Sequence, residues 1–416
     1  MQGYNLKVEP SVINGEIKAP PSKSYAHRIL LSAFLSGEEV TVHNLGSSVD
    51  VEVTLNAIKT LGASVKINGD TAVVKRGELP KEKVIIDCRE SGSSLRFLLP
   101  IVCALGVNAE FTGSKRLLER PIKELVDTLN AHGGKIENLT VKGKLNRGVY
   151  EVDGGISSQY ITGLLLALSH IDGESQIVIK GELVSKPYVD ITLSVLSDFG
   201  VNFEETEFGY KIKGGYKIKN HEFTVEGDWS GSAFLLSLGA ISGKVTVKGL
   251  NVNSCQGDKK IVEILKNFGA SVELGDNQVT VSKKPLTAIS VDMQDVPDLV
   301  QVVSVVSAYA SGVTKIYGVD RLRLKESDRV LAVINSLSKV GIKAEYKDNF
   351  IIVNGGKPLG GVVDGGNDHR TVMSAVVMAS SSAGESLVLG GQAITKSYPN
   401  FVKDFEEIGG KIKCLY

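Results

Sequence analysis

The chain has 416 residues, a length that predicts two or three domains. Its 47 basic and 47 acidic residues balance, so no overall charge indicates nucleic acid or an anionic membrane as a partner. The four cysteines, Cys88, Cys103, Cys255 and Cys414, are scattered, which excludes a zinc ribbon and is typical of a reducing, cytoplasmic setting. The first residues lack the apolar core of a signal peptide, and no apolar run approaches membrane-spanning length.

A helix-ending pattern recurs six times along the chain, each time as a glycine followed by a short alternating strand. Large apolar residues stand four and seven positions before each glycine, as Ile58 and Leu55 do before Gly62. Positions so spaced share one helix face, and glycine often ends a helix in the left-handed conformation, so the pattern predicts six amphipathic helices. The six glycines, spaced 67 to 72 residues apart, are Gly62, Gly133, Gly200, Gly269, Gly341 and Gly409.

A second helical series is interleaved with the first and is apolar nearly all round, which predicts buried helices. Its members are residues 24–36, 92–105, 157–171, 229–241, 298–310 and 369–382. Alternating segments such as 39–44 and 244–248 predict half-exposed strands. The sequence therefore predicts an α/β protein of six similar units, divided three plus three, with the crossing near residues 225–228.

The starts of these helices differ from unit to unit and carry many basic residues. A base in a first turn lies at the positive end of the helix dipole, which is unfavourable unless an anion binds there. Any single one is most simply a solvated side chain, but nine together favour helix N-termini that hold oxyanions. The nine, all in or beside predicted first turns, are Lys23, Arg28, Arg96, Arg120, Lys186, Lys325, Arg329, Arg370 and Lys396.

Other devices for binding phosphate or metal do not occur in the sequence. It has no phosphate-binding loop of the Gly-x-x-x-x-Gly-Lys-Ser/Thr type and no dinucleotide glycine fingerprint. Its six histidines show no metal-ligand spacing. These absences argue against a nucleotide-triphosphate transferase and predict anion binding by side chains and backbone N–H groups alone.

Two carboxylates stand among the basic residues. Asp298 opens a buried helix, and Glu326 lies between Lys325 and Arg329. As structural residues they would be an N-cap and a first-turn acid paired with nearby bases. As functional residues they would transfer protons in a cationic site. The sequence leaves both interpretations open.

Taken together and in order, these segments resemble the 5-enolpyruvylshikimate-3-phosphate synthase family (3-phosphoshikimate 1-carboxyvinyltransferase) along the whole chain. Any one motif is weak, but the ordered set across six units is specific. The matching motifs are Pro21-Ser22-Lys23-Ser24 with Arg28, Ser91-Gly92 with Arg96, Glu119-Arg120-Pro121, Ser157-Ser158-Gln159, Ser185-Lys186-Pro187-Tyr188, Pro297-Asp298, Lys325-Glu326-Ser327-Asp328-Arg329, Asp368-His369-Arg370 and Lys396.

The resemblance implies a two-lobed enolpyruvyl transferase fold, an inside-out α/β barrel of six βαβαββ repeats whose helices aim their N-termini at the cleft between lobes. The implied first lobe combines residues 1–19 and 227–416, and the second lobe comprises residues 20–226. The implied reaction transfers the enolpyruvyl group of phosphoenolpyruvate to the 5-hydroxyl of shikimate 3-phosphate, through a tetrahedral intermediate, and releases phosphate. It would serve the shikimate pathway to chorismate and the aromatic amino acids, in a cytoplasmic monomer without metal or organic cofactor.

The resemblance also assigns roles to individual residues. Asp298 would be the base for the hydroxyl, Glu326 the acid and base at the methyl group, and Lys23 would touch both substrates. Shikimate 3-phosphate would be held by Lys23, Ser24, Arg28, Ser157, Ser158, Gln159, Ser185, Tyr188, Asp298 and Lys325. Phosphoenolpyruvate would be held by Lys23, Gly92, Arg120, Gln159, Arg329, Arg370 and Lys396.

Two positions depart from the family pattern. Glu90 replaces an often-found asparagine, and Arg321 stands where relatives often carry asparagine or glutamate. Neither belongs to the implied catalytic set.

Two rival functions remain open. The sister transferase acting on UDP-N-acetylglucosamine usually has a reactive cysteine where this chain has Lys115. A non-catalytic anion-binding repeat protein would account for the bases but not for the two carboxylates among them.

Overall fold

The computed structural model describes residues 3–416, and its contacts divide the chain into two compact units. Unit 1 holds the N-terminal segment as far as Ser22 together with Glu226–Tyr416, and unit 2 is Lys23–Val225. Each unit has its own hydrophobic core, and no helix among residues 3–416 is long and apolar enough to cross a membrane. The lobe boundaries predicted from the sequence lie within a few residues of the points where the chain passes from one unit to the other. That the two units act as separate functional lobes stays a prediction.

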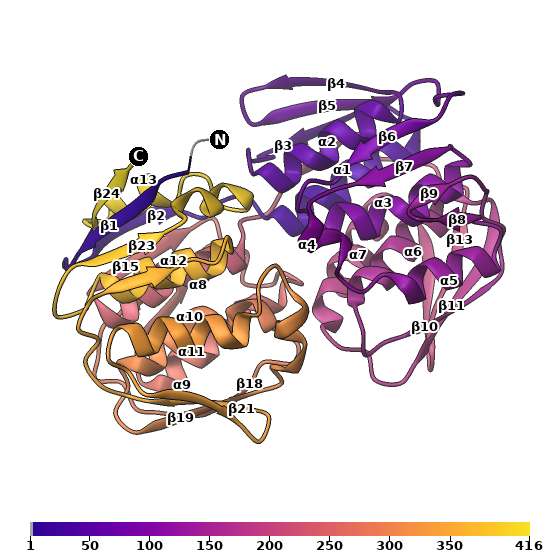
Figure 1. Cartoon of the computed structure of the whole chain (residues 1–416). Coiled ribbons are helices and arrows are strands. Elements are labelled where there is room, and N and C mark those ends of the chain that lie inside the picture. The colour runs from indigo at the N-terminus through magenta and orange to yellow at the C-terminus, as the bar shows by residue number, and fades with distance from the viewer. Residues whose placement is uncertain (1–2) are drawn as a thin grey trace. The chain divides into compact units, whose positions relative to one another are not determined.

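Unit 2 contains three four-stranded sheets, each with its own helices (Figure 1). The first group is β14 (Glu222–Thr224), α1 (Lys23–Ser36), β3 (Val40–His43), α2 (Val49–Thr60), β4 (Ala63–Asn68) and β5 (Thr71–Arg76). The second is β6 (Val84–Asp87), α3 (Gly92–Leu105), β7 (Ala109–Thr112), α4 (Lys115–Leu118), α5 (Lys123–Ala131), β8 (Ile136–Glu137) and β9 (Thr140–Val141). The third is β10 (Val149–Asp153), α6 (Ser158–His170), β11 (Gly173–Lys180), α7 (Lys186–Asp198), β12 (Asn202–Thr206) and β13 (Gly209–Gly214).

Unit 1 contains the other three sheets. The first group is β2 (Asn14–Lys18), α8 (Trp229–Ile241), β15 (Lys244–Lys248), η1 (Gly257–Lys260), α9 (Ile261–Phe268), β16 (Ser271–Gly275) and β17 (Gln278–Ser282). The second is β18 (Ser290–Asp292), η2 (Pro297–Leu299), α10 (Val300–Ala308), β19 (Val313–Tyr317), η3 (Asp320–Leu324), α11 (Arg329–Lys339), β20 (Ala344–Lys347) and β21 (Phe350–Asn354). The third is β22 (Val362–Asp364), α12 (His369–Ala379), β23 (Ser386–Leu389), η4 (Gly391–Lys396), α13 (Phe401–Glu407), β24 (Lys411–Leu415) and β1 (Asn5–Glu9).

All six sheets share one order, which confirms the predicted βαβαββ repeat. In four sheets the strands directly before and after the buried helix pair in parallel, as β6 and β7 do with Val84 opposite Ala109. The remaining two strands pair antiparallel with each other beside them, giving the order β6-β7-β9-β8 and its equivalents. In these four sheets the buried helix connects the parallel pair, since parallel strands need a crossover connection.

Three of the sheets are completed by strands taken from far along the chain. The first sheet of unit 2 borrows β14, which pairs in parallel with β3. In unit 1, β2 pairs in parallel with β15, and β1 lies between β23 and β24, so that indigo and yellow strands lie side by side in Figure 1. Neither unit is therefore a simple run of three successive repeats.

The glycine pattern found in the sequence has the predicted conformation. All six glycines of the first series have positive φ, from 81° at Gly200 to 103° at Gly269. At Gly62 a side chain would also collide, because a Cβ atom there would lie 2.1 Å from the carbonyl oxygen of Glu78. Left-handed backbone favours glycine, so these positions end the helices as expected.

Some predicted helix starts are wrong by several residues. Arg120 lies between α4 and α5, Lys325 follows η3, and Lys396 ends η4, so none of the three lies in the first turn of an α-helix. Arg120 and Tyr398 each precede a proline, which disfavours the helical conformation at the residue before it. Consequently α5 begins only at residue 123 and α13 at residue 401.

Candidate active site

Arg329, the first residue of α11, is the centre of a charged cluster in unit 1. It is 1% exposed, and its guanidinium donates to Asp298 Oδ1 at 2.8 Å, Glu326 Oε2 at 2.9 Å and Asp368 Oδ2 at 2.8 Å. Burial lowers the pKa of Arg329, but the three carboxylates outweigh burial and raise the pKa well above its ordinary value. The planar fork of an arginine suits such multiple recognition, and the cation fixes all three acids in place.

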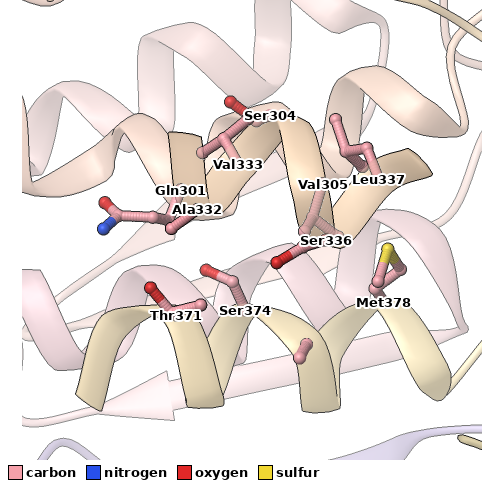
Figure 2. Close-up of a pocket in the computed structure, with 11 residues that line it drawn as sticks. Gln301, Ser304, Val305, Ala332, Val333, Ser336, Leu337, Thr371, Ser374 and Met378 are labelled. Carbon is pink, nitrogen blue, oxygen red and sulfur yellow. The ribbon is translucent and has the colours of Figure 1, made fainter. Parts of the chain in front are cut away.

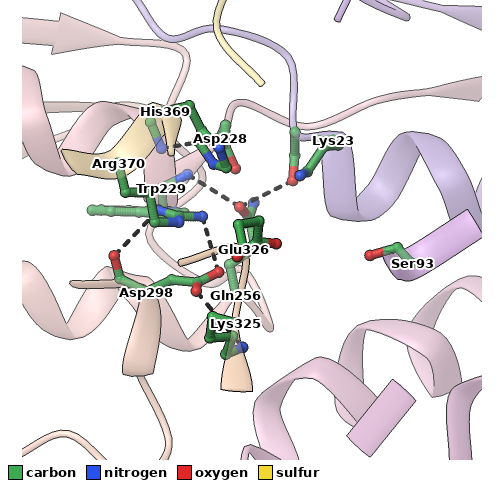
Figure 3. A network of polar contacts seen from close by, with 12 residues as sticks. Lys23, Ser93, Asp228, Trp229, Gln256, Asp298, Lys325, Glu326, His369 and Arg370 are labelled. Carbon is green, nitrogen blue, oxygen red and sulfur yellow. Dashed lines mark hydrogen bonds and ion pairs between the residues drawn. The ribbon is translucent and has the colours of Figure 1, made fainter. Parts of the chain in front are cut away.

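Asp298 lies in η2, immediately before α10, and is bound by cations from two further segments. Arg370 Nη2 donates to Asp298 Oδ2 at 2.9 Å, and Lys325 Nζ lies 4.0 Å from Oδ1 (Figure 3). Burial would raise the pKa of Asp298, but Arg370, Lys325 and Arg329 together hold it well below its usual value. The carboxylate is therefore ionised and surrounded by positive charge.

The structure tests whether the two carboxylates occupy helix caps. The N-cap positions of η2 and α10 are Val296 and Leu299, and α11 is capped by Asp328, which accepts from the backbone N–H of Leu331. Glu326 pairs with Arg329, as the structural interpretation expected, but it lies before the helix and outside its first turn. Neither acid is a helix cap, so the N-cap interpretation of Asp298 is wrong.

Asp368 is a member of the cluster that the sequence did not single out. It caps α12 by accepting from the backbone N–H of Arg370 at 2.9 Å, and it also accepts from Arg329 and from Ser327 Oγ. Burial would raise its pKa, but Arg329 outweighs burial and lowers it. The signal was present, since Asp368 stands directly before a predicted buried helix and belongs to the motif Asp368-His369-Arg370.

Lys396 contacts the backbone just before this cap. Its Nζ donates to the carbonyl oxygen of Asn367, a residue in the left-handed conformation with φ 55°. The structure thus gathers Asp298, Glu326, Lys325, Arg329 and Arg370 into one cluster and sets Lys396 beside the residue that precedes Asp368.

In unit 2, Lys23 is the first residue of α1 and forms an ion pair with Asp50 of α2. Lys23 Nζ lies 2.7 Å from Asp50 Oδ2, and both side chains are largely buried. Asp50 is another residue that the sequence analysis missed, because nothing local links it to a lysine 27 residues earlier. The pair fixes the ammonium group at the start of α1.

Arg28, one turn further along α1, is buried among neutral oxygen atoms. It donates to Thr192 Oγ1 at 2.7 Å, to the carbonyl oxygen of Tyr188 at 2.8 Å and to that of Ser24 at 2.7 Å. Burial lowers the pKa of Arg28 to about 10, against a smaller opposing effect of nearby tyrosines. The structure therefore links Arg28 with Ser24 and Tyr188, but through their main-chain atoms.

A second basic group surrounds the start of α3. Arg96 donates to Gln159 Oε1 at 3.1 Å and to the carbonyl oxygen of Pro121, and Gln159 Nε2 donates to Ser93 Oγ. A Cβ atom at Gly92 would lie 2.5 Å from Arg120 Nη1 and 2.8 Å from Arg96 Nη1. A side chain at position 92 would therefore have to displace the ends of two guanidinium groups.

The predicted serines lie at helix starts, and each has a distinct backbone role. Ser157 caps α6 by accepting from the N–H of Gln159, and Ser158 is the buried first residue of that helix. Ser185 is the N-cap residue of α7 and is left-handed, with φ 55°. Strained backbone at a residue other than glycine often marks a functional site.

The two departures from the family pattern have different surroundings. Glu90 lies half-buried in the turn before α3. Arg321 Nη2 donates to the carbonyl oxygen of Gln294 at 2.8 Å, and burial lowers its pKa. Within residues 3–416 no group of three or more His, Cys, Asp or Glu side chains is placed to hold a metal ion.

Comparison with known proteins covers nearly the whole chain. Residues 8–405 match the family model of EPSP synthase (3-phosphoshikimate 1-carboxyvinyltransferase). The 3-phosphoshikimate 1-carboxyvinyltransferase of Clostridium novyi is 39% identical, and that of Brachyspira hyodysenteriae is 38% identical. The aligned regions cover 98% of this chain in both cases, with 98% and 99% of the relatives.

Solved structures show the same fold. EPSP synthase from Acinetobacter baumannii has a TM-score of 0.84 at 22% identity, covering 99% of this chain and 100% of that chain. The enolpyruvyl transferase NikO from Streptomyces tendae has a TM-score of 0.78 at 18% identity, covering 100% and 99%. The two-lobed enolpyruvyl transferase fold expected from the sequence is confirmed. With its matching family model and its close relatives, the chain belongs to the EPSP synthase (3-phosphoshikimate 1-carboxyvinyltransferase) family.

Proposed function

We propose that this chain is a 3-phosphoshikimate 1-carboxyvinyltransferase, which moves the enolpyruvyl group of phosphoenolpyruvate to the 5-hydroxyl of shikimate 3-phosphate and releases phosphate. Family membership supports the activity. The observation that carries the mechanism is the carboxylate of Asp298, which lies among the cationic groups of Arg370, Arg329 and Lys325. Glu326 is bound to the guanidinium of Arg329, which also binds Asp298.

In the proposed reaction, the 5-hydroxyl oxygen of shikimate 3-phosphate bonds to C2 of phosphoenolpyruvate. At the same time the methylene carbon of phosphoenolpyruvate takes up a proton. Phosphate then leaves, and a proton departs from the new methyl group to restore the C=C bond. Asp298 takes the hydroxyl proton, and Glu326 gives and retakes the proton on carbon. Arginine and lysine side chains stabilise the departing phosphate.

The cations around Asp298 would make the basicity of this carboxylate depend on whether substrate is bound. With Arg370 and Lys325 directed at its carboxylate, Asp298 has a depressed pKa and is a weak base. A phosphate or carboxylate group that binds these two cations would neutralise part of that field. The basicity of Asp298 would then rise only when the anionic substrates are bound.

Unit 2 would supply most of the groups that hold shikimate 3-phosphate. Arg28 is buried and bonded to neutral oxygens, so its charge is available to an anion without first breaking an ion pair. Lys23, Ser24, Ser157, Ser158, Gln159, Ser185 and Tyr188 would complete that set. Phosphoenolpyruvate would be bound by Lys23, Gly92, Arg120, Gln159, Arg329, Arg370 and Lys396.

The activity can be tested with purified full-length protein by measuring phosphate release. Release should require both phosphoenolpyruvate and shikimate 3-phosphate. Turnover with UDP-N-acetylglucosamine in place of shikimate 3-phosphate would instead assign the sister activity, and no turnover with either acceptor would leave an anion-binding protein.

The roles of the two acids can be tested with isosteric amides. Asp298→Asn and Glu326→Gln should each lower kcat by about 10²- to 10⁴-fold, the usual contribution of a general acid or base. Glu345→Gln, which removes an exposed carboxylate on β20, is the matched control and should keep wild-type turnover. An acid variant whose kcat equals that of the control would lose its assigned role.

Two further parts of the proposal concern the setting of the enzyme. We propose a cytoplasmic monomer, supported by four cysteines that form no disulfide in the structure. Sedimentation of the active protein tests the oligomeric state, since a dimeric mass would exclude the monomer.

A further inference from the structure

A pocket lies between helices α10, α11 and α12 of unit 1. Its cavity volume is about 10 Å³, which is about the room that one water molecule needs. Gln301 and Ser304 of α10 line one side, Thr371 and Ser374 of α12 the other, and Ser336 belongs to α11 (Figure 2). The Gln301 amide lies at the same end of the pocket as the Thr371 and Ser374 hydroxyls, whereas the Ser304 hydroxyl points away from α12.

Four buried polar atoms at this pocket have no hydrogen-bond partner among residues 3–416. They are Gln301 Oε1 and Nε2, Thr371 Oγ1 and Ser374 Oγ, and the three residues are only 2%, 3% and 5% exposed. Ser304 differs, because its hydroxyl donates to the carbonyl oxygen of Val300 within its own helix. Buried polar groups are almost always satisfied, so atoms of this kind that gather at one cavity indicate a bound polar partner.

The chemistry of the lining selects the partner. The Gln301 amide offers one acceptor and two donors, and each hydroxyl can donate or accept. Water both donates and accepts and typically makes about three bonds to such buried groups. No charged side chain lines the pocket, so nothing there favours an ion.

Two residues that line the pocket are close in sequence to members of the charged cluster. Gln301 is three residues after Asp298, and Thr371 follows Arg370 in the chain. Asp298 and Arg370 are joined by the 2.9 Å ion pair and by a bond from Arg370 Nη1 to the carbonyl oxygen of Asp298. Whatever joins Gln301 to α12 therefore also fixes the relative position of this pair.

We propose that the pocket binds ordered water, which links Gln301 to Thr371 and Ser374, and that Gln301 is thereby a positioning residue for Asp298 and Arg370. The positioning role rests on the proposed function, whereas the water site does not. A water bridge of this kind is nearly as favourable as a direct bond and sets the spacing of the two helices.

A high-resolution crystal structure of the full chain tests the water site. Electron density for water within hydrogen-bond distance of the Gln301 amide and of at least one of the two hydroxyls is the expected result. A dry pocket, or a Gln301 side chain bonded directly to protein atoms, would overturn the proposal whether or not the protein is an enolpyruvyl transferase.

Steady-state kinetics test the positioning role. Gln301→Leu should lower kcat/KM for phosphoenolpyruvate by about tenfold, because misplaced catalytic groups lose rate steeply with small displacements. Gln301→Asn, which can still bond water, should recover part of this loss. Ser307→Ala is the matched control, since that buried α10 hydroxyl bonds its own helix at Val303 and does not line the pocket.

Two outcomes of these measurements would refute the role. One is a Gln301→Leu enzyme with the kinetics of the Ser307→Ala control, and the other is an Asn variant no better than Leu. If Gln301→Leu does not fold, the near-isosteric Thr371→Val takes its place and should show the same loss of kcat/KM. An inactive wild type would refute the proposed function, while the crystal structure would still decide the water site.

Discussion

Each unit contains a buried arginine, and the two arginines have opposite kinds of hydrogen-bond partner. In unit 1, Arg329 is bonded to the carboxylates of Asp298, Glu326 and Asp368. In unit 2, Arg28 is equally buried but bonds hydroxyl and carbonyl oxygens, including those of Thr192 and Tyr188. The folded state thus compensates one charge and leaves the other uncompensated.

This difference suggests that the two units have different roles although they are built from the same repeat. A guanidinium held by three acids fixes those acids, which is what proton transfer needs. A guanidinium held by neutral groups keeps its affinity for an anion, because no internal ion pair must break before the ligand binds. The repeats are alike where helices end, as at Gly62 and Gly269, and differ in what lies at the other end of the helices.

The largest effect should come from removing the compensating charge in unit 1. Arg329→Met leaves three acids without their common partner and should lower the free energy of unfolding by about 3–5 kcal/mol, the cost of breaking a buried pair. Arg329→Lys keeps the charge without the fork and should lose less. Urea unfolding measures both variants; a Met variant as stable as the Lys variant would mean that the acids do not depend on the cation.

A smaller effect on stability and a clear effect on binding should follow in unit 2. Arg28→Met should weaken the binding of shikimate 3-phosphate by about 1.5–3 kcal/mol, the range for a hydrogen bond to a charged group. Arg28 also donates to Thr162 Oγ1, and the hydroxyls of Thr162 and Thr192 stay hydrogen-bonded to each other at 2.8 Å when the guanidinium is removed. Calorimetric titration together with urea unfolding checks both expectations, and unchanged affinity would contradict the comparison.

The smallest effects concern pH and should have opposite signs in the two units. Burial lowers the pKa of His27 in unit 2 well below its ordinary value of 6.5, with Lys23 and Arg28 acting in the same direction. The unfolded chain then binds a proton that the folded chain does not, so this histidine makes stability fall as pH drops below about 6.5. The slope is at most about 1.4 kcal/mol per pH unit for one proton.

Asp258 in unit 1 should act in the other direction. Burial, with the nearby Asp298, raises the pKa of Asp258 to about 7, so the folded chain binds the proton and stability rises as pH falls from about 7 towards 4. The free energy of unfolding at pH 7.0 and 5.5 can be compared for wild type, His27→Asn and Asp258→Asn. On acidification, His27→Asn should lose less stability than wild type, because it lacks the histidine that destabilises the fold at low pH. Asp258→Asn should lose more than wild type, because it lacks the stabilising aspartate proton. If both variants differ from wild type in the same direction, the prediction is contradicted.

Much of the fold could be predicted from local patterns. The apolar spacing before each of the six glycines predicted the helices, and the left-handed backbone at Gly133 or Gly409 follows from the same local rule. The motifs around Asp298 and Arg370 were also visible in the sequence, and so was the resemblance of the whole chain to its family. Helix starts before a proline, as at Arg120, were predicted too early because the proline shifts the first turn.

The rest was decided by tertiary structure. The sequence presents the repeats in order, but β14, β1 and β2 complete sheets whose other strands lie far away in the chain. Asp368 lies 39 residues from Arg329, and Asp50 lies 27 residues from Lys23. Helix periodicity and glycine caps are set by neighbours a few residues apart, so the sequence alone determined them. The ion pairs of Arg329 with Asp368 and of Lys23 with Asp50 join residues far apart in the sequence, as do the sheets completed by β14, β1 and β2, and only the folded chain shows which acid compensates which base.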